Sequence, residues 1–485
     1  MGAACSRDSA RRADPVPPTT ASTSTTTAPD PTATAPLAAP TTPRPAPAPA
    51  PAAGAPAGPC DVPAGLADPW PDRPRYAAHL TLDLSARLLT GEEHVRFVPD
   101  APTDRLVFRL WPNAARLGQA GSRFEITAAF VGDRLTAGTY EPGGAAPGRP
   151  GTVFFLPGSF PAGQPVEARL QFRLALPGAI NDRVAVVGRS VRLGSVLPVL
   201  SWIRGQGWQT SPAVGAFAEA AASEVADYDV TVTAPPGLSV LATGEQSEPG
   251  RFVAQAVRDW AATAAPMRTG EAPAQNGRTT VTVGVAEGAG GDPAGLAQVT
   301  AAAVDRLAAR FGEYPYARLT VGVTASLTGG VEFPTHIFLG AGVPIIHLVH
   351  EVAHQWFYGV NGNDQYRDPW LDEGLATYAE ARVDSRLPGQ RARPIPAAGE
   401  GHIGDSMAYW DARPGAYFVA VYVGGLQALG ALADRLGGYD ALDCGLRRYH
   451  RDRAYTVSRP ADLFGALQAQ TGLDPRPVVA TFGIS

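Results

Sequence analysis

The spacing of the apolar residues changes near residue 270, and this change constrains the fold most. Before it, apolar residues alternate with mostly polar ones, as at Leu80, Leu82 and Leu84 and again over 166–174. A period of two residues predicts half-buried strands. After it, strand patterns are joined by helical ones near 295–311, 343–358, 370–386 and 416–436. The sequence therefore predicts a multidomain α+β protein, with an N-terminal antiparallel β-sandwich domain at 61–270 and a mixed α/β, mainly helical domain at 271–485.

Residues 1–60 have a composition that does not suit a folded core. They contain 17 Ala, 14 Pro and 10 Thr and no aromatic residue. Such a segment buries too little apolar surface to offset its conformational entropy, so we expect a disordered, extended spacer. Small residues precede Cys5, as at the end of a bacterial lipoprotein signal. We expect a lipid anchor at Cys5 and a place on the extracellular face of the cell membrane, or a secreted protein in which Cys5 is an incidental thiol.

The overall composition bears on the partners and on the cysteines. The formal net charge is −5, which does not suit nucleic-acid binding, because that requires a basic face. The sequence has no run of about 18 apolar residues, so we expect no transmembrane helix. We also expect a monomer. Three cysteines are too few for a disulfide scaffold. Cys60 and Cys444 would pair in an oxidising compartment if they lie close together; otherwise Cys444 is buried and Cys60 is free.

The stretch His350-Glu351-Val352-Ala353-His354 carries the strongest chemical signal in the chain. On a helix, positions i and i+4 share a face, so both imidazoles can reach one zinc ion at about 2.0–2.1 Å. Glu351 is rotated by about 100° from the first histidine, which aims it at a metal-activated water as a general base. A short motif of this kind also arises by chance, so the residues around it must show whether it binds a metal.

A second segment, Trp370-Leu371-Asp372-Glu373-Gly374, begins a further predicted helix. Two histidines and Glu373 would leave the fourth position of a tetrahedral zinc site open for water, which is typical of catalytic zinc. Glu380 lies about two turns further on the same face, where it would accept from the imidazole of a ligand; a solvated helix face is the alternative. His347 would close the site as a fourth ligand, so we expect it in the core or lining the pocket.

Residues 350–380 resemble the zinc aminopeptidases of the aminopeptidase N family, which are gluzincins and include leukotriene hydrolase. Upstream, Gly329-Gly330-Val331-Glu332-Phe333-Pro334 stands where the family usually has Gly-Ala-Met-Glu-Asn. Downstream, Tyr422-Val423-Gly424-Gly425 resembles the family's Tyr-x-Lys-Gly, with glycine in place of lysine. Because 47 residues follow Gly438, the resemblance is to short bacterial members with two domains.

The resemblance implies a thermolysin-like catalytic domain and a zinc-dependent aminopeptidase acting on peptides with a free N-terminus. One zinc ion would be held by His350, His354 and Glu373. Glu351 would act as the base, and the Tyr422 hydroxyl would donate to the tetrahedral oxyanion. For Tyr422 the alternative is a buried aromatic on a helix stripe.

On the substrate side, the resemblance implies that Glu332 binds the α-ammonium of the peptide, while the backbone of Gly329 and Gly330 approaches the chain closely. A strand-edge surface acid is the alternative for Glu332. Some members take a second contact to the amine from the β domain; Glu219 and Glu224 are candidates, and nothing in the spacing selects them. Two other functions stay open: a thermolysin-type zinc endopeptidase, which has no use for Glu332, and a non-catalytic surface-binding relative.

Overall fold

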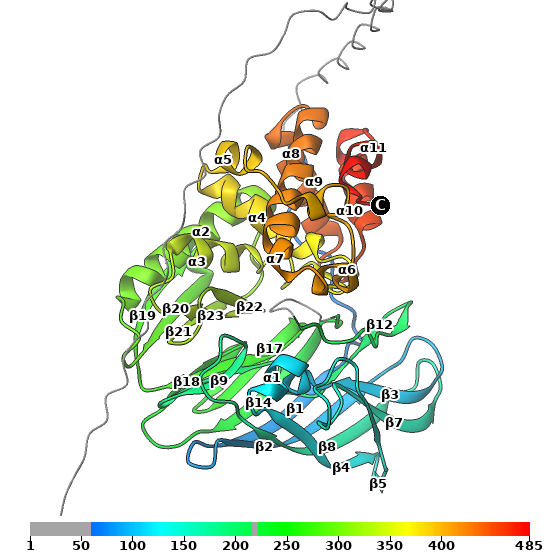
Figure 1. Cartoon of the computed structure of the whole chain (residues 1–485), viewed down its shortest axis with the longest axis vertical. Helices are drawn as coiled ribbons and strands as arrows, with labels where there is room; N and C mark the ends of the chain where they lie inside the picture. The colour runs from blue at the N-terminus through cyan, green and yellow to red at the C-terminus, as the bar shows by residue number, and fades with distance from the viewer. Residues whose placement is uncertain (1–59, 216–221) are drawn as a thin grey trace, which may run out of the picture. The chain divides into compact units, whose positions relative to one another are not determined.

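The computed structural model describes residues 60–215 and 222–485 (Figure 1). Residues 1–59 of the predicted spacer, Cys5 among them, and Glu219 lie outside the described residues.

The strands with the most regular alternation join in one eight-stranded sheet with the order β16-β17-β14-β1-β2-β8-β4-β5. In β1 every second side chain is buried, from Tyr76 to Leu82, while Arg75 and His79 on the other face are exposed. This is the pattern expected of a sheet with one covered face. The strands are β1 (Arg75–Asp83), β2 (Leu88–Phe97), β4 (Arg123–Val131), β5 (Arg134–Leu135), β8 (Val166–Ala175), β14 (Ala226–Thr233), β16 (Glu245–Glu248) and β17 (Arg251–Val257).

One pair in this sheet runs parallel, so the prediction of an antiparallel β domain is wrong at that point. β1 pairs with β14 in parallel, with Tyr76 opposite Tyr228 and Leu80 opposite Val232. Parallel neighbours need a long connection, and the chain between β1 and β14 passes through many other strands. Alternation predicts that a segment is a strand, but it does not predict whether a neighbouring strand runs parallel or antiparallel. That direction depends on the path of the chain between the two strands.

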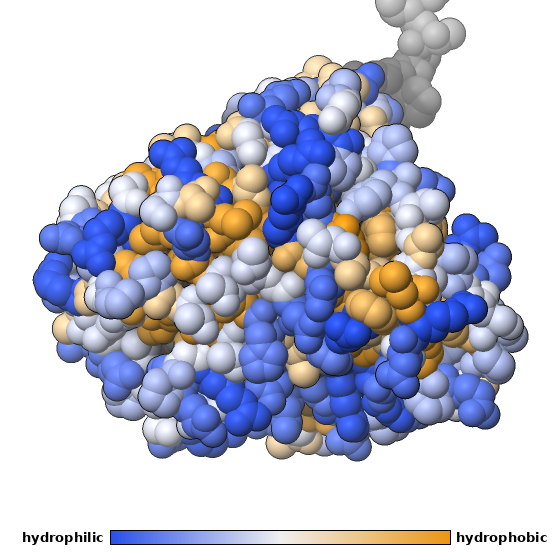
Figure 2. Space-filling view, turned by 90° about the horizontal axis from the view of Figure 1, so that it is seen from below, coloured by the Kyte–Doolittle hydropathy of each residue, from blue (hydrophilic) through white to orange (hydrophobic). Residues whose placement is uncertain are grey.

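Smaller sheets complete the β-rich part and share its hydrophobic core, in which Phe97, Phe108, Phe124 and Trp260 are almost fully buried. Hydrophilic residues predominate on the face shown in Figure 2, with apolar patches between them. The further elements are β3 (Thr103–Arg109), η1 (Trp111–Asn113), α1 (Ala115–Gln119), β6 (Thr139–Glu141), β7 (Val153–Phe160), β9 (Val184–Val187), β10 (Ser190–Gly194), β11 (Val199–Leu200), β12 (Trp202–Ile203), β13 (Gly207–Trp208), β15 (Ser239–Ala242) and β18 (Ala261–Ala265).

A five-stranded sheet with the order β19-β20-β21-β23-β22 follows. Its strands are β19 (Met267–Ala274), β20 (Thr279–Ala286), β21 (Arg318–Thr324), β22 (Gly330–Phe333) and β23 (His336–Gly340), with η2 (Gln275–Gly277) between the first two. β20, β21 and β23 are parallel, and β22 lies antiparallel at one edge. The domain limit predicted at residue 270 falls inside β19, and the division into domains stays a prediction.

Helices make up most of the remaining chain, near the positions predicted. The first, α2, begins where the Asp292 carboxylate accepts from two backbone N–H groups and ends before Gly312, whose φ is 104°. The elements are α2 (Pro293–Phe311), α3 (Ile345–Ala353), β24 (Gly362–Asn363), α4 (Trp370–Val383), α5 (Leu387–Arg391), η3 (Ala397–Gly399), α6 (Met407–Asp411), α7 (Pro414–Tyr417), the π-helix η4 (Phe418–Gly424), α8 (Gly425–Leu436), α9 (Tyr439–Asp452), β25 (Val457–Ser458), α10 (Pro460–Thr471), α11 (Arg476–Val479) and η5 (Ala480–Phe482).

Among the described residues, one helical stretch, Pro414–Leu436, is long and apolar enough to cross a membrane by length and composition. Of its most apolar window, 67% is buried inside the fold, as in the core helix of a soluble protein.

The contacts between the β-rich part and the helical part include a buried arginine and a disulfide. Arg258, fully buried, donates to the carbonyls of Gly359, Val360 and Thr456. Cys60 and Cys444 form a disulfide with a Cα–Cα distance of 5.5 Å, which selects the paired alternative. The bridge ties the start of the described chain to α9.

Candidate metal centre

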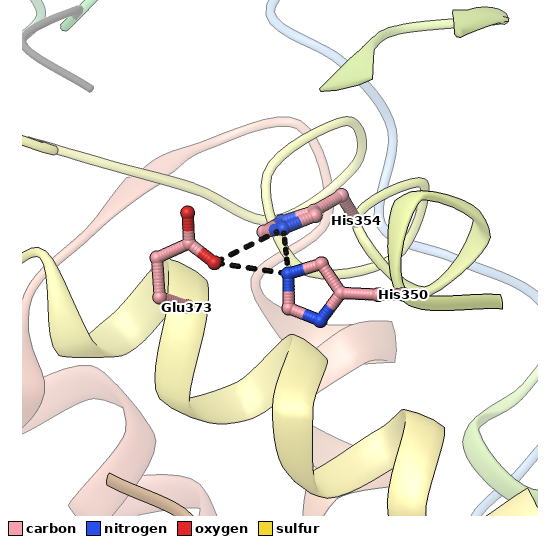
Figure 3. A group of neighbouring side chains, drawn as sticks. All are labelled: His350, His354 and Glu373. Atoms are coloured by element: carbon pink, nitrogen blue, oxygen red, sulfur yellow. Dashed lines mark hydrogen bonds and ion pairs between the residues drawn. The ribbon is translucent and has the colours of Figure 1, made fainter. Parts of the chain in front are cut away.

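The two histidines of the motif are placed by α3, which buries Leu348, Val349 and Val352 in the hydrophobic core. His350 lies in the last turn, and His354 is the C-cap residue, still with helical angles of φ −62° and ψ −16°. Their Nε2 atoms are 3.0 Å apart (Figure 3). The i, i+4 spacing therefore converges two imidazoles even though the helix ends between them.

Glu373 enters from the first turn of α4 and completes a triangle with the histidines (Figure 3). Its Oε2 lies 3.1 Å from His350 Nε2 and 3.3 Å from His354 Nε2. Tetrahedral ligands at about 2.0–2.1 Å from zinc are separated by about 3.3 Å, so this donor set fits a zinc ion. All three residues are buried, and their ligand atoms lie within 4.8 Å of one another.

Carboxylates stand behind both imidazoles. Glu380 Oε2 lies 3.2 Å from His350 Nδ1, in the position predicted. Asp372 Oδ1 lies 2.7 Å from His354 Nδ1, and Gln365 donates to the other oxygen of Asp372 at 2.6 Å. These contacts orient the rings so that Nε2 faces the centre.

Sequence reasoning missed Asp372. The available signal was its place directly before Glu373, at the start of the same helix.

The charges of the centre favour a cation. Burial opposes a charge on His350, but hydrogen bonds to Glu373 and Glu380 outweigh it and raise the pKa of His350 to about 10. Burial also acts on Glu373, but the attraction of His354 and the contacts with both imidazoles hold the pKa of its carboxyl far below the usual range. The carboxylates that stabilise a positive charge on the imidazoles would equally stabilise a divalent metal ion bound between them.

Glu351 faces the same centre from α3. Its side chain is buried, and burial raises the pKa of its carboxyl to about 7. A Cβ on Gly330 would lie 2.3 Å from Glu351 Cγ, so β22 reaches the base this closely only because residue 330 is glycine. The space left by the missing side chain of Gly330 is thus occupied by Glu351. At Gly329, by contrast, an added Cβ would meet nothing within 4 Å.

Glu332 projects from β22 toward the same group of side chains. One carboxylate oxygen each from Glu332 and Glu351 and one ring nitrogen of His354 lie within 4.8 Å of one another. Glu332 is 7% exposed, and burial raises the pKa of its carboxyl to about 8. It is therefore no surface acid at a strand edge.

Tyr422 comes from η4 and contacts two members of the ligand triangle. Its hydroxyl donates to Glu373 Oε1 at 2.5 Å, and its ring stacks on that of His350 with centroids 5.5 Å apart. The helices meet at two glycines: a Cβ on Gly425 would lie 2.7 Å from the Cα of Gly374. This backbone contact between α8 and α4 brings η4, which directly precedes α8, close enough to α4 for the hydrogen bond.

The ligand triangle, Glu351, Glu332 and Tyr422 line one cavity of about 690 Å³. His347 lines it without joining the ligand triangle, as expected. From the β-rich part the lining includes Arg116, Asn181 and Gly215. Glu224 accepts from the backbone of Arg204 and does not belong to the lining.

The β-rich part also anchors the segment that leads into β22. Arg192, 1% exposed, donates to the Thr324 hydroxyl at 3.0 Å, to the Ala325 carbonyl at 2.8 Å and to the Ile180 carbonyl at 2.6 Å. Asn181 Oδ1 accepts from the backbone N–H of Thr328 at 2.9 Å. The position of the wall that carries Glu332 thus depends on contacts across more than 130 residues of sequence.

No known family model matches the chain. Over 150 residues the chain is 27% identical to aminopeptidase N of Streptomyces lividans, covering 26% of this chain and 17% of that protein. Over 140 residues it is 29% identical to the membrane alanyl aminopeptidase of Manduca sexta, covering 26% of this chain and 14% of that protein. The aligned parts span less than a fifth of the length of these relatives.

Solved structures extend the likeness over most of the chain. The M1 zinc metallopeptidase of Deinococcus radiodurans superposes with a TM-score of 0.62 at 19% identity, covering 87% of this chain and 94% of the other. A mutant of that protein bound to the peptide Tyr-Ser-Ala superposes with a TM-score of 0.62 at 19% identity, covering 87% and 95%. At this identity the superpositions show a shared fold.

Proposed function

We propose that the chain is a member of the aminopeptidase N family of zinc peptidases and a zinc-dependent aminopeptidase that removes N-terminal residues from peptides. One observation carries this proposal. The triangle of His350, His354 and Glu373 opens into a cavity that also holds a buried carboxylate suited to the base, Glu351, and a second one suited to the substrate amine, Glu332.

The chemistry follows from these positions. Zinc, when bound by the triangle, supplies a Lewis acid that lowers the pKa of a coordinated water to about 7 and polarises a carbonyl. Glu351 takes the proton from the attacking water and passes it to the leaving amine. Tyr422 donates its O–H to the developing oxyanion, and Asp372 holds the His354 ring in place.

Glu332 distinguishes an aminopeptidase from an endopeptidase. An ionised carboxylate is costly in a buried site without a cationic partner, which is why the pKa of Glu332 is raised. An α-ammonium group bound beside it would supply that partner and fix the first residue in register with the metal. The endopeptidase and the non-catalytic alternatives leave this buried acid without a use.

We also propose the finer features expected from the sequence: a β-sandwich and a thermolysin-like domain, one zinc ion, a monomer, and a place outside the cytoplasm with a lipid anchor at Cys5. The disulfide between Cys60 and Cys444 supports the location, because such bonds persist in oxidising compartments. In a chain that is exported, Cys5→Ser should move the protein out of the membrane fraction. Continued membrane attachment of this variant would refute the anchor.

The function is tested with aminoacyl-coumarin substrates, with and without a chelator. We expect hydrolysis of free-amine substrates, its loss with the chelator and its return with added zinc. N-acetylated versions of the same substrates should not be cleaved. Equal cleavage of blocked and free substrates would favour the endopeptidase, and no cleavage of any would favour the binding relative.

A further inference from the structure

Large apolar side chains are rarely exposed in the described part of the chain. Three stand out there: Leu135 at 67%, Ile345 at 44% and Phe418 at 46% exposure. Of these, Phe418 alone lines the cavity of the metal centre. An aromatic ring left in contact with water inside a ligand cavity gains free energy when an apolar group covers it.

Phe418 is held in place by its neighbours. It is the first residue of η4, and its ring centroid lies 5.3 Å from that of Tyr417 and 5.5 Å from that of Tyr422. Tyr417 is fully buried, so it gives the exposed ring a rigid support. A ring that is already positioned loses little conformational entropy when a ligand binds.

Resting on the proposed function, we propose that Phe418 forms the wall of the subsite for the first residue's side chain, so that the enzyme prefers large apolar N-terminal residues such as leucine and phenylalanine. Only one residue precedes the scissile bond in an aminopeptidase substrate. Its ammonium lies at Glu332 and its carbonyl at Tyr422, so its side chain leaves the backbone between these two points. Phe418 is the exposed apolar surface next to Tyr422, one helical turn away.

A charged residue on the same wall defines the competing outcome. Asp411 lines the cavity and would favour a basic first residue if it reached the side chain. Its Oδ1, however, already accepts from the backbone N–H of Gly215 at 2.8 Å. We therefore expect the first side chain to contact the exposed ring of Phe418 rather than the Asp411 carboxylate.

The test compares kcat/KM for leucyl-, phenylalanyl-, alanyl- and arginyl-coumarin in the zinc-loaded full chain. These substrates differ only in the first residue. We expect the leucyl and phenylalanyl substrates to be preferred, and Phe418→Ala to reduce the leucyl-to-alanyl ratio about tenfold, the range for losing apolar contact in a pocket. Phe418→Tyr retains the ring and should retain the ratio. Ile345→Ala removes an equally exposed apolar side chain outside the cavity and should leave the ratio unchanged.

Three results would overturn this inference: an unchanged ratio in Phe418→Ala, an equal loss of kcat on every substrate, which would make the ring a mere support for Tyr422, or a wild-type preference for arginine. Zinc content and the far-ultraviolet spectrum of each variant confirm that it is folded. If the wild type cleaved none of the substrates, the proposed function itself would fall, and this outcome is distinct from the other three.

Discussion

A single buried histidine, His336, and the buried pair of the metal centre, His350 and His354, have opposite properties because their neighbours differ. His336 on β23 is fully buried, with Thr320 Oγ1 2.6 Å from Nδ1 and Thr263 Oγ1 3.0 Å from Nε2. Burial lowers the pKa of His336 to about 3. In the metal centre burial acts in the same direction on His350, but carboxylates next to the ring raise its pKa to about 10.

The comparison shows that the groups around a buried histidine determine whether it can belong to a cation site. Each ring nitrogen of His336 has a threonine hydroxyl as its partner, and a hydroxyl can either donate to a ring nitrogen or accept from a ring N–H. This arrangement satisfies a neutral ring and joins β18 to the five-stranded sheet. The metal centre surrounds its rings with Asp372, Glu373 and Glu380 instead, and those anions can share a metal cation.

The largest effect should come from breaking the ligand triangle. His354→Ala and Glu373→Ala each remove one of three ligands and should lose bound zinc together with nearly all peptidase activity. His336→Gln is the matched control, a buried histidine outside the triangle, and it should keep its zinc. Metal analysis of the purified, folded proteins decides the matter. A full equivalent of zinc in either ligand variant would end the three-ligand assignment.

Glu351→Gln should separate chemistry from metal binding. It removes the base but leaves the triangle intact, so zinc should stay bound while kcat falls by about 10²–10⁴. KM should change little. Steady-state kinetics together with metal analysis measure both quantities. A kcat within threefold or so of the wild type would exclude Glu351 as the base.

Asp372→Asn tests whether the carboxylates behind the rings account for the contrast with His336. The change retains the shape of the side chain but removes its charge, and zinc affinity should fall about 10–100-fold. Competition with a zinc chelator of known affinity measures the shift. Asp411→Asn is the control, since it neutralises an acid of the same cavity whose Oδ1 accepts from the backbone N–H of Gly215. An unaltered affinity in Asp372→Asn would show that the charge behind His354 contributes nothing.

The smallest effect concerns the neutral ring itself. Because the folded state holds the pKa of His336 near 3, the unfolded chain binds one more proton below about pH 6.5. This residue should therefore lower the free energy of unfolding by about 1.4 kcal/mol for each pH unit between about 6.5 and 3. Urea titrations of metal-free wild type and His336→Gln from pH 7 to 4 isolate this contribution as the difference between them. Parallel curves would contradict it.

Several features could be read from the sequence because they depend on neighbours close in the chain. The period-two segments are strands, and the long helical segments are helices. The spacing of His350 and His354 converges their rings because helix geometry repeats every 3.6 residues. The same geometry placed Glu380 behind His350, two turns beyond Glu373.

Other features depended on the tertiary structure. The sequence by itself determined which segments are strands and helices and which two helices carry the metal ligands, because these follow from local periodicity. Tertiary packing decided that β14 runs parallel to β1, that Cys60 meets Cys444, and that Arg192 holds the segment before β22. It also decided that Gly330 makes room for Glu351 and that Phe418 lies exposed in the cavity. These contacts and this exposure depend on segments that are separated in the sequence, and the packing of the whole molecule decides how close those segments lie.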